Sequence, residues 1–360
     1  MKIVEINNYA GFLSLEERWN EVLQRCNHTI FSTWEWLATW WKHFGNDKRL
    51  VLLLAEHDGK ILGIAPMMYT VHRMFGLRRG KIEFISTPGA DYNDFILADK
   101  NEESLRFFLD YLNNLPERWE CIDLIDIPQE ANSLGLLRDV SKILTRAHVC
   151  PYIRLPKSYD AFLGSLNYKK RKNLRRASRS LEKDFKVEFV DCSGTQYFAE
   201  GIESFFELHQ KRWESKGFCG VFGDQRSRSF HMDIARSFAE KGWLGLYLLK
   251  VFDHPVAAHY GFKYRSKFYS YLTGFDPRYS KYGVGSLLAA NIIARCIQDG
   301  LVEFDFLRGT EEYKERWNTT ARWTQRVVIP RKSCLDSFRS LLYEEYWRQG
   351  NRIKYLLRIQ

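Results

Sequence analysis

The sequence predicts an α/β protein of the α+β type, with two domains built on the same plan. Three observations support this prediction: the length, a β-hairpin pattern in each half, and the same order of elements around both hairpins. A chain of 360 residues can form two domains of about 150 to 200 residues each. We expect the first domain to cover residues 1–150 and the second to cover residues 151–360.

Each hairpin pattern consists of two apolar runs that flank a short turn. The runs are residues 50–56 and 61–66 in the first half and residues 243–252 and 256–262 in the second half. Helical stretches with a nearby tryptophan precede the hairpins, at residues 34–44 and 230–239. A helix and a late strand follow each hairpin. We expect them at residues 102–115 and 121–127 in the first half and at residues 286–299 and 302–307 in the second half. This order indicates a duplication whose two copies have diverged.

The second half carries glycines between a strand and a helix. Residues 268–273 favour a strand, and residues 274–277 end it with turn chemistry. Gly283 and Gly285 then precede an apolar-periodic helix at residues 286–299. Glycine lets a backbone approach a ligand closely, and a helix start offers unpaired N–H groups to anions. The spacing therefore indicates a phosphate-binding loop, with an ordinary turn as the alternative.

This block resembles the acyl-CoA motif of the GNAT acetyltransferase superfamily, whose loop reads Gln or Arg, two residues, Gly, one residue, and Gly or Ala. Here the loop reads Ser280-Lys281-Tyr282-Gly283-Val284-Gly285, so Ser280 stands where Gln or Arg is usual, and Arg278 and Lys281 offer positive charge nearby. The resemblance implies acetyl-CoA or another acyl-CoA as co-substrate. The cofactor-binding residues that it implies are Leu272, Thr273, Gly274, Arg278, Lys281, Tyr282, Gly283, Val284, Gly285 and Ser286.

An ordered series of motifs resembles the FemAB-like double-GNAT group, and within it the acetyltransferases of cellulose and exopolysaccharide biosynthesis. The motifs are residues 64–66, 90–94, 171–176, 208–213, 255–258, 274–277, 304–309 and 313–314. The resemblance implies tandem GNAT-like domains, each a mixed, mostly antiparallel sheet flanked by helices. It also implies N- or O-acyl transfer, typically of acetyl, to a sugar, a sugar nucleotide or another small acceptor. The first copy lacks the glycine loop, so we expect only the second copy to bind the cofactor.

Acyl transfer from a thioester needs a donor for the carbonyl oxygen, a base for the acceptor and an acid for the thiolate. The resemblance assigns the first role to backbone N–H groups of Leu272, Thr273 and Gly274. His259 is the candidate base because small residues flank it on a core strand, and a packed core histidine is the alternative.

Three further side chains follow as catalytic candidates. Asp305 lies within an apolar strand and must have a partner, for which His259, Lys314, Arg308 and the acceptor are the candidates. Tyr313 and Lys314 follow that strand and could protonate the thiolate. A structural ion pair at Asp305 and an ordinary charged helix face around Tyr313 are the alternatives.

All the excess positive charge of the chain lies in its second part. Residues 1–150 hold 17 basic and 21 acidic residues, whereas residues 151–360 hold 37 and 23. Residues 167–186 form a basic amphipathic helix whose apolar stripe is Leu166, Leu174, Ala177 and Leu181. A solvated face is the usual meaning, and the functional alternatives are the CoA 3′-phosphate, a polyanionic or lipid-linked acceptor, a membrane surface and RNA. Residues 334–360 are also predicted to be helical and basic, with core packing favoured over peripheral membrane contact.

Composition excludes several other classes of protein. Seven dispersed cysteines without a Cys-x-x-Cys pair argue against a disulfide framework and a zinc site, so we expect no metal. No apolar run reaches the ~20 residues of a membrane span, and the start has no signal-peptide pattern, so we expect a cytoplasmic protein. Two rival functions remain: a FemAB-type transferase that uses aminoacyl-tRNA, and a non-catalytic CoA-binding protein. Acceptor identity, acyl length and oligomeric state stay open.

Overall fold

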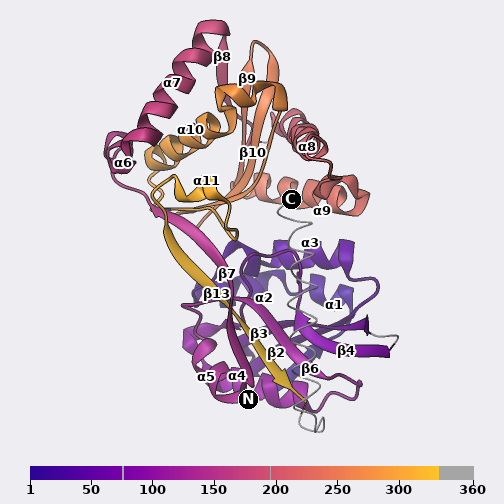
Figure 1. Ribbon diagram of the computed structural model, residues 1–360. Coiled ribbons are helices and arrows are strands. Elements are labelled where there is room, and N and C mark those ends of the chain that lie inside the picture. Colours follow the sequence, from indigo (N-terminus) through magenta and orange to yellow (C-terminus); the bar gives the residue numbers. More distant parts are fainter. Residues whose placement is uncertain (75–76, 195, 332–360) are drawn as a thin grey trace. The chain divides into compact units, whose positions relative to one another are not determined.

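The computed structural model describes residues 1–74, 77–194 and 196–331, and their contacts divide them into two compact units (Figure 1). The first unit contains Met1–His148 and residues 323–331, and the second contains Val149–Arg322. The sequence placed all residues after 150 in the second domain. The difference arises because the last described strand pairs with a strand of the first unit. The helix predicted at residues 334–360 lies outside the described residues.

The first unit is a mixed sheet with helices. Its strands are β1 Lys2–Ile6, β2 Arg49–His57, β3 Lys60–Met74, β4 Leu77–Phe84, β5 Ile96–Leu97 and β6 Cys121–Pro128, and β7 Ile143–Arg154 begins in it. Its helices are α1 Tyr9–Leu13, α2 Glu16–Gln24, η1 Ile30–Ser32, α3 Trp34–Phe44, η2 Ala98–Lys100, α4 Glu102–Asn113 and α5 Leu134–Val140. Leucine and phenylalanine side chains of α4 and leucine side chains of α5 pack with apolar side chains of the sheet in one core.

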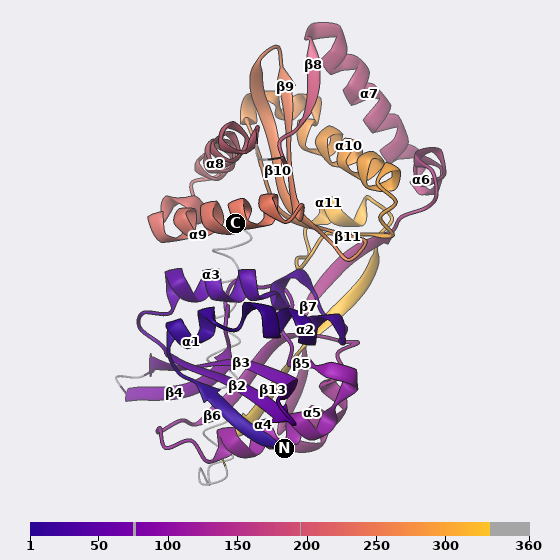
Figure 2. The same ribbon diagram turned by 180° about the vertical axis from the view of Figure 1, so that it is seen from behind.

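The second unit is a mixed sheet between two helical layers. Its strands are β8 Val187–Asp191, β9 Leu244–Val251, β10 His254–Tyr264, β11 Lys267–Phe275 and β12 Glu303–Asp305, and β13 Thr320–Pro330 begins in it. Its helices are α6 Tyr159–Ser165, α7 Tyr168–Asp184, α8 Phe198–Glu214, η3 Val221–Gly223, α9 Gln225–Glu240, η4 Pro277–Tyr282, α10 Val284–Gln298 and α11 Glu312–Glu315. Figures 1 and 2 place α7 and α10 on one face of this sheet and α8 and α9 on the other.

The two sheets share one topology, as the duplicated sequence pattern predicted. In the first unit the order is β1-β2-β3-β4-β6, with antiparallel neighbours except for the parallel pair β4 and β6. In the second unit the order is β8-β9-β10-β11-β12, again with one parallel pair, β11 and β12. The fold is therefore a tandem of mixed, mostly antiparallel sheets flanked by helices.

Each sheet is completed by a strand that follows the other unit's elements in sequence. β7 follows the last helix of the first unit and pairs with β12 of the second through Tyr152, Ile153 and Arg154. β13 follows the last helix of the second unit and pairs with β6 of the first, for example through Val327 and Leu124. The chain order alone does not predict this exchange, because it depends on pairing between residues about 150 positions apart for β7 with β12 and about 200 positions apart for β6 with β13.

Local predictions from the sequence agree with these elements. The hairpins β2–β3 and β9–β10 and the helices α3, α4, α9 and α10 lie where the sequence predicted them. Two elements are longer than predicted, because β3 extends to Met74, beyond the predicted run at residues 61–66, and α9 begins at Gln225, before the predicted start at residue 230. The late strand β12 is shorter than the predicted run, since it covers only Glu303–Asp305. None of the described helices is both long and apolar enough to cross a membrane.

Candidate functional site

Strands β11 and β12 diverge after a short parallel contact. They pair only at Lys267 with Glu303, Phe268 with Phe304, and Tyr269 with Asp305. Beyond Tyr269, β11 continues to Phe275 along β10. Among the strands that the structure describes, residues 270–275 therefore have a partner on one side only, and a gap opens on the other.

The backbone of Thr273 faces this gap. The N–H of Asp276 donates to the carbonyl of Val256 beside β10, at 2.9 Å, and peptide groups alternate in direction along a strand. The N–H and carbonyl of Thr273 therefore turn away from β10, whereas those of Leu272 and Gly274 turn toward it. Arg212 supports this orientation because its Nη1 donates to the Thr273 carbonyl oxygen at 3.1 Å and to Oγ1 at 2.7 Å.

Gly274 permits the close packing of helix α8 against β11. A Cβ atom at this position would lie 2.3 Å from the backbone nitrogen of His209 and 2.6 Å from the carbonyl carbon of Leu208. No real side chain tolerates such a contact, so a larger residue would force the helix and the strand apart. Gly274 thus has a packing role. Its N–H turns toward β10, whereas the N–H of Thr273 turns into the gap.

The loop after β11 leads into an open helix start. Gly283 ends η4 in the left-handed region, with φ of 67°, and α10 begins without a side-chain cap. Ser286 and Leu287 donate to the Gly283 carbonyl, while the N–H groups of Val284 and Gly285 have no acceptor among the described residues. The nearest atom to a Cβ at Gly283 or Gly285 would be 3.8 Å away. This start offers unpaired donors and space to a ligand.

A cavity of about 370 Å³ lies at this helix start. It is bounded by α7, by η4 and by the first turn of α10. Its lining residues are Lys170, Asn173, Leu174, Arg176, Ala177, Ser180, Ser280, Lys281, Tyr282, Gly283, Ser286 and Arg316. Four of them are cationic, and none of the described lining residues is acidic. The helix dipole adds to the positive potential, so the cavity suits an anion.

Of the cofactor-binding residues predicted from the sequence, the structure brings Lys281, Tyr282, Gly283 and Ser286 into this cavity. Arg278 is 81% exposed in its side chain and forms an ion pair with Asp276 at 2.6 Å, so its guanidinium already has a carboxylate partner. Asp276 also caps η4, because its side chain accepts a hydrogen bond from the backbone N–H of Arg278. The side-chain hydroxyl of Tyr282 donates to Asp184 at 2.9 Å, which ties the loop to the end of α7.

Helix α7 supplies a buried cation that the sequence analysis did not single out. Lys170 is 8% exposed, and its Nζ lies 3.6 Å from the ring centre of Trp317 and 3.4 Å from Oγ of Ser286. Burial, and then the nearby Arg316, lower the pKa of Lys170 to about 8. A signal was present in the sequence, because Lys170 falls four residues from both Leu166 and Leu174 on the apolar stripe.

The rest of α7 agrees with the prediction of an outward basic face. Leu174 and Leu181 are buried, and Arg171 donates to the carbonyls of Gly164 and Leu166 at the end of α6. The exposed cations are Lys169, Lys172, Arg175, Arg176, Arg179 and Lys183. The helix therefore presents the buried Lys170 and the exposed Arg176 to the cavity, and a row of further cations to solvent.

His259 lies deep in the sheet beside Thr273. Register places it opposite Thr273 on β11 and opposite Tyr247 on β9. It is 2% exposed, Nε2 has no hydrogen-bond partner among the described residues, and burial lowers its pKa to about 3. The imidazole is therefore neutral at physiological pH, and its role as a base stays a prediction.

Asp305 and Lys314 are both buried and both hold backbone groups. Asp305 accepts from the N–H of Leu307 at 2.8 Å and lies 4.0 Å from Arg322. Lys314 donates to the carbonyls of Leu307 and Arg308, at 3.3 and 2.8 Å, and pairs with Glu311 at 2.9 Å. Lys314 is thus not the partner of Asp305. Its ammonium fixes the loop after β12 on the far side of the gap.

Tyr313 and Arg212 complete the surroundings of the gap. Burial of the hydroxyl, and then Glu311, raise the pKa of Tyr313, while Arg212 opposes this shift. The phenol is therefore protonated at neutral pH and can donate a proton. Tyr313 as a residue is 39% exposed, so solvent or a ligand can reach it.

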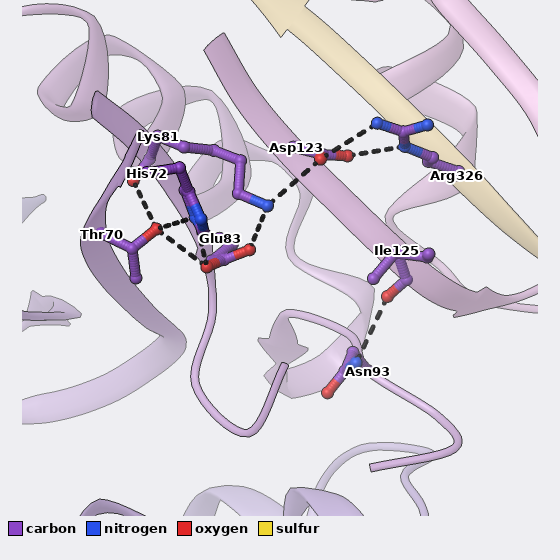
Figure 3. A network of polar contacts seen from close by, with 8 residues as sticks. All are labelled: Thr70, His72, Lys81, Glu83, Asn93, Asp123, Ile125 and Arg326. Atoms are coloured by element: carbon purple, nitrogen blue, oxygen red, sulfur yellow. Dashed lines mark hydrogen bonds and ion pairs between the residues drawn. The ribbon is translucent and has the colours of Figure 1, made fainter. Parts of the chain in front are cut away.

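The first unit holds a buried cluster of a different kind (Figure 3). Lys81 forms an ion pair with Glu83 and lies 3.4 Å from Asp123, and Arg326 binds both oxygens of Asp123 at 2.8 and 3.1 Å. Thr70 donates its hydroxyl to Glu83 at 2.8 Å. Glu83 and Asp123 outweigh the effect of burial and raise the pKa of Lys81, so this lysine keeps its charge within a neutralised network.

Comparisons with known proteins agree with this geometry. Residues 168–315 match the family model described as an acetyltransferase (GNAT) domain. FemX superposes with a TM-score of 0.63 and 14% identity, over 91% of this chain and 97% of that chain. A conserved protein of unknown function from Bacteroides thetaiotaomicron gives 0.60 and 12%, over 91% and 100%. L-PGS from Bacillus licheniformis gives 0.53 and 14%, over 89% and 93%.

Identities at this level show a shared fold. No protein in the curated collection of sequences matches this chain. Among the residues that the structure describes, no group of three or more His, Cys, Asp or Glu side chains is placed to hold a metal ion. Residues 168–315 of the second unit thus match a GNAT domain model, and the superpositions show a shared fold over most of the chain.

Proposed function

We propose that the second unit transfers an acyl group from acyl-CoA to an amine or hydroxyl. One observation carries this proposal: the open start of α10 adjoins the strand that diverges from β12. Phosphate groups of the donor would accept from the N–H groups of Val284 and Gly285, with Lys281 beside them. The pantetheine arm would then extend along the free edge of β11.

The transfer step uses groups at that edge. The acceptor nitrogen or oxygen forms a bond to the acyl carbon, and the carbon–sulfur bond breaks. The N–H of Thr273 is positioned to stabilise the oxyanion, because it turns into the gap. The thiolate takes a proton from the phenol of Tyr313, and the acceptor gives its proton to Nε2 of His259. Since the pKa of His259 is low, its proton transfer would accompany bond formation rather than precede it.

Lys314 and Asp305 have supporting parts in this proposal. Lys314 holds two carbonyls of the loop that faces β11, and Asp305 holds the N–H of Leu307 in the same loop. Both residues would set the width of the gap without contact with the reacting atoms. The acceptor class follows only from the resemblance, which favours a sugar, a sugar nucleotide or another intermediate of polysaccharide synthesis.

Substitution of the loop glycines tests the donor site. Gly283→Val and Gly285→Leu together should weaken acetyl-CoA binding at least tenfold, as measured by calorimetry, because side chains would fill the helix start. Gly300→Val is the matched control for strain: Gly300 has φ of 73°, ends α10, and has no atom within 4 Å of a Cβ. The donor site would be contradicted if the Gly283/Gly285 variant and the Gly300→Val control both bound acetyl-CoA as tightly as the wild type.

A second donor, aminoacyl-tRNA, is favoured by the row of exposed cations on α7. It predicts that tRNA binds with a strong salt dependence and that Arg175→Met with Arg179→Met lowers this affinity. A filter-binding titration across ionic strength separates the two donors. Binding of acyl-CoA without transfer to any amine or hydroxyl would instead favour the non-catalytic alternative.

A further inference from the structure

Lys170 is a buried charge without a carboxylate partner. It is 8% exposed, and no carboxylate of the described residues lies within 4 Å of its Nζ. Its ammonium has three donors, yet its polar contact is one long hydrogen bond to Ser286. A buried ammonium in this state is costly, and the ring of Trp317 offsets only part of that cost.

The groups that face Lys170 add to this cost. Arg176 comes from α7 itself, Lys281 from η4, and Arg316 from the segment after α11. Two carboxylates of these elements are already engaged: Glu312 pairs with Arg316 at 2.7 Å, and Asp184 accepts from Tyr282. Helix α10 contributes Ser286 and the positive end of its dipole. Every full charge on the described lining is therefore positive.

We propose that Lys170 is a phosphate-binding residue whose counter-ion is supplied by the ligand and not by the protein. This inference rests on the proposed function and specifies how its donor is held. A phosphate in the cavity would accept from Lys170, from Arg176 or Arg316, and from the α10 start at once. The ligand class is a phosphate ester or diphosphate that carries at least two negative charges.

Binding of such a ligand is coupled to proton uptake. In the free protein, burial and Arg316 hold the pKa of Lys170 at about 8, so near this pH about half of the molecules lack the proton. A bound phosphate favours the ammonium and raises that pKa. Binding at pH 8 should therefore take up about half a proton, and affinity should fall as pH rises above that point.

Calorimetry of CoA binding to the whole protein tests the inference. Lys170→Met should weaken CoA binding at least tenfold and abolish proton uptake, measured at pH 8 in two buffers that differ in ionisation enthalpy. Lys170→Arg should retain binding without the uptake, since arginine keeps its proton. Lys172→Met is the matched control, because Lys172 is an exposed lysine on the same helix. The melting temperature of Lys170→Met should equal or exceed that of the wild type, since the change removes an uncompensated charge.

The outcomes separate this inference from the proposed donor. Wild-type affinity for CoA in Lys170→Met, or unchanged proton uptake, would overturn the role of Lys170 while the donor site stands. If the wild type binds inorganic pyrophosphate through Lys170 but does not bind CoA, the inference holds and the acyl-CoA donor fails. If the wild type binds neither CoA nor pyrophosphate, the role of Lys170 and the acyl-CoA donor are both wrong. If Lys170→Met does not fold, Lys170→Arg decides the test. The inference requires that this variant binds CoA and takes up no proton on binding.

Discussion

Helices α4 and α10 occupy the same place in the two units but begin in opposite ways. At α4, the side chain of Asn101 accepts from the N–H of Ser104 at 2.9 Å, and Glu102 and Glu103 lie in the first turn. At α10, the cap position is Gly283, with no side-chain cap and no acid in the first turn. The protein itself satisfies the positive end of α4 with a side-chain cap and two acids, whereas that of α10 has neither.

Two buried lysines, Lys81 and Lys170, differ in the same way as the two helix starts, because only Lys81 has carboxylate partners among the described residues. Lys81 is 3% exposed and has two carboxylate partners, which raise its pKa. Lys170 is 8% exposed and has a neighbouring arginine, and its pKa is lowered to about 8. The two lysines are thus buried to a similar degree but have different charged neighbours. A paired buried cation indicates a structural network, whereas an unpaired one indicates a site for an anion.

The largest expected effect comes from breaking the paired network. Lys81→Met leaves Glu83 and Asp123 without their shared cation and should reduce the free energy of unfolding of the first unit by about 3–5 kcal/mol. Amide hydrogen exchange along β4 and β6 measures the stability of the first unit separately from that of the second. Lys170→Met should show no comparable increase in exchange in the second unit. Equal destabilisation by both changes would remove the distinction between the two lysines.

A smaller effect separates the two kinds of glycine near the site. Gly274→Ala places a methyl group 2.3 Å from the α8 backbone and should cost about 1–3 kcal/mol of stability. Gly285→Ala meets no atom closer than 3.8 Å and lies in a helix, so it should be neutral or slightly stabilising. Urea denaturation compares the two variants with the wild type. An equally stable Gly274→Ala would mean that α8 does not pack against β11 as described.

The smallest effect is a difference in pH dependence. Lys81 lowers the pKa values of Glu83 and Asp123, and Arg326 adds to this at Asp123. The stability that they contribute is present above their ordinary pKa values and is lost as pH falls through the lowered ones, by about 1.4 kcal/mol per pH unit for each extra proton bound. Lys170 adds a second limb of the same sign at alkaline pH, because its lowered pKa makes stability rise with pH between about 8 and 10.5. At Lys170 the folded state disfavours the charged form, whereas at Glu83 and Asp123 it favours the charged form.

Unfolding free energies measured from pH 2 to pH 10 check both limbs, in each of which stability rises with pH. Asp123→Asn should flatten the acid limb, and Lys170→Met should flatten the alkaline limb. An alkaline limb that persists in Lys170→Met would assign this titration to another group.

Much of the architecture could be predicted because its determinants are local. Alternating and helical apolar patterns located both hairpins and the helices α4 and α10, and the glycines marked the loop at Gly283. The length of β12 could not be predicted, since a strand ends where its pairing ends, and β11 diverges after Tyr269. The exchange of β7 and β13 between the sheets also depends on non-local pairing.

The candidate site divides in the same way. The sequence located Lys281, Gly283 and Ser286, which line the cavity, but it could not distinguish Thr273 from its neighbours Leu272 and Gly274. That distinction needs the direction of peptide groups relative to β10 and the contact with Arg212. Lys170 was hidden within a basic run, although its spacing placed it on the apolar stripe. The roles of His259 and Tyr313 remain predictions.

The amino-acid sequence by itself determined the duplicated order of elements, the basic character of the second part and the open loop before α10, because periodicity, charge and glycine content act over a few residues. Only the tertiary structure decided which buried charges have partners. Lys81 and Lys170 are both buried lysines, and the residues that face them come from distant parts of the chain, such as Asp123 for one and Arg316 for the other. The free energy of a buried charge depends on those distant neighbours.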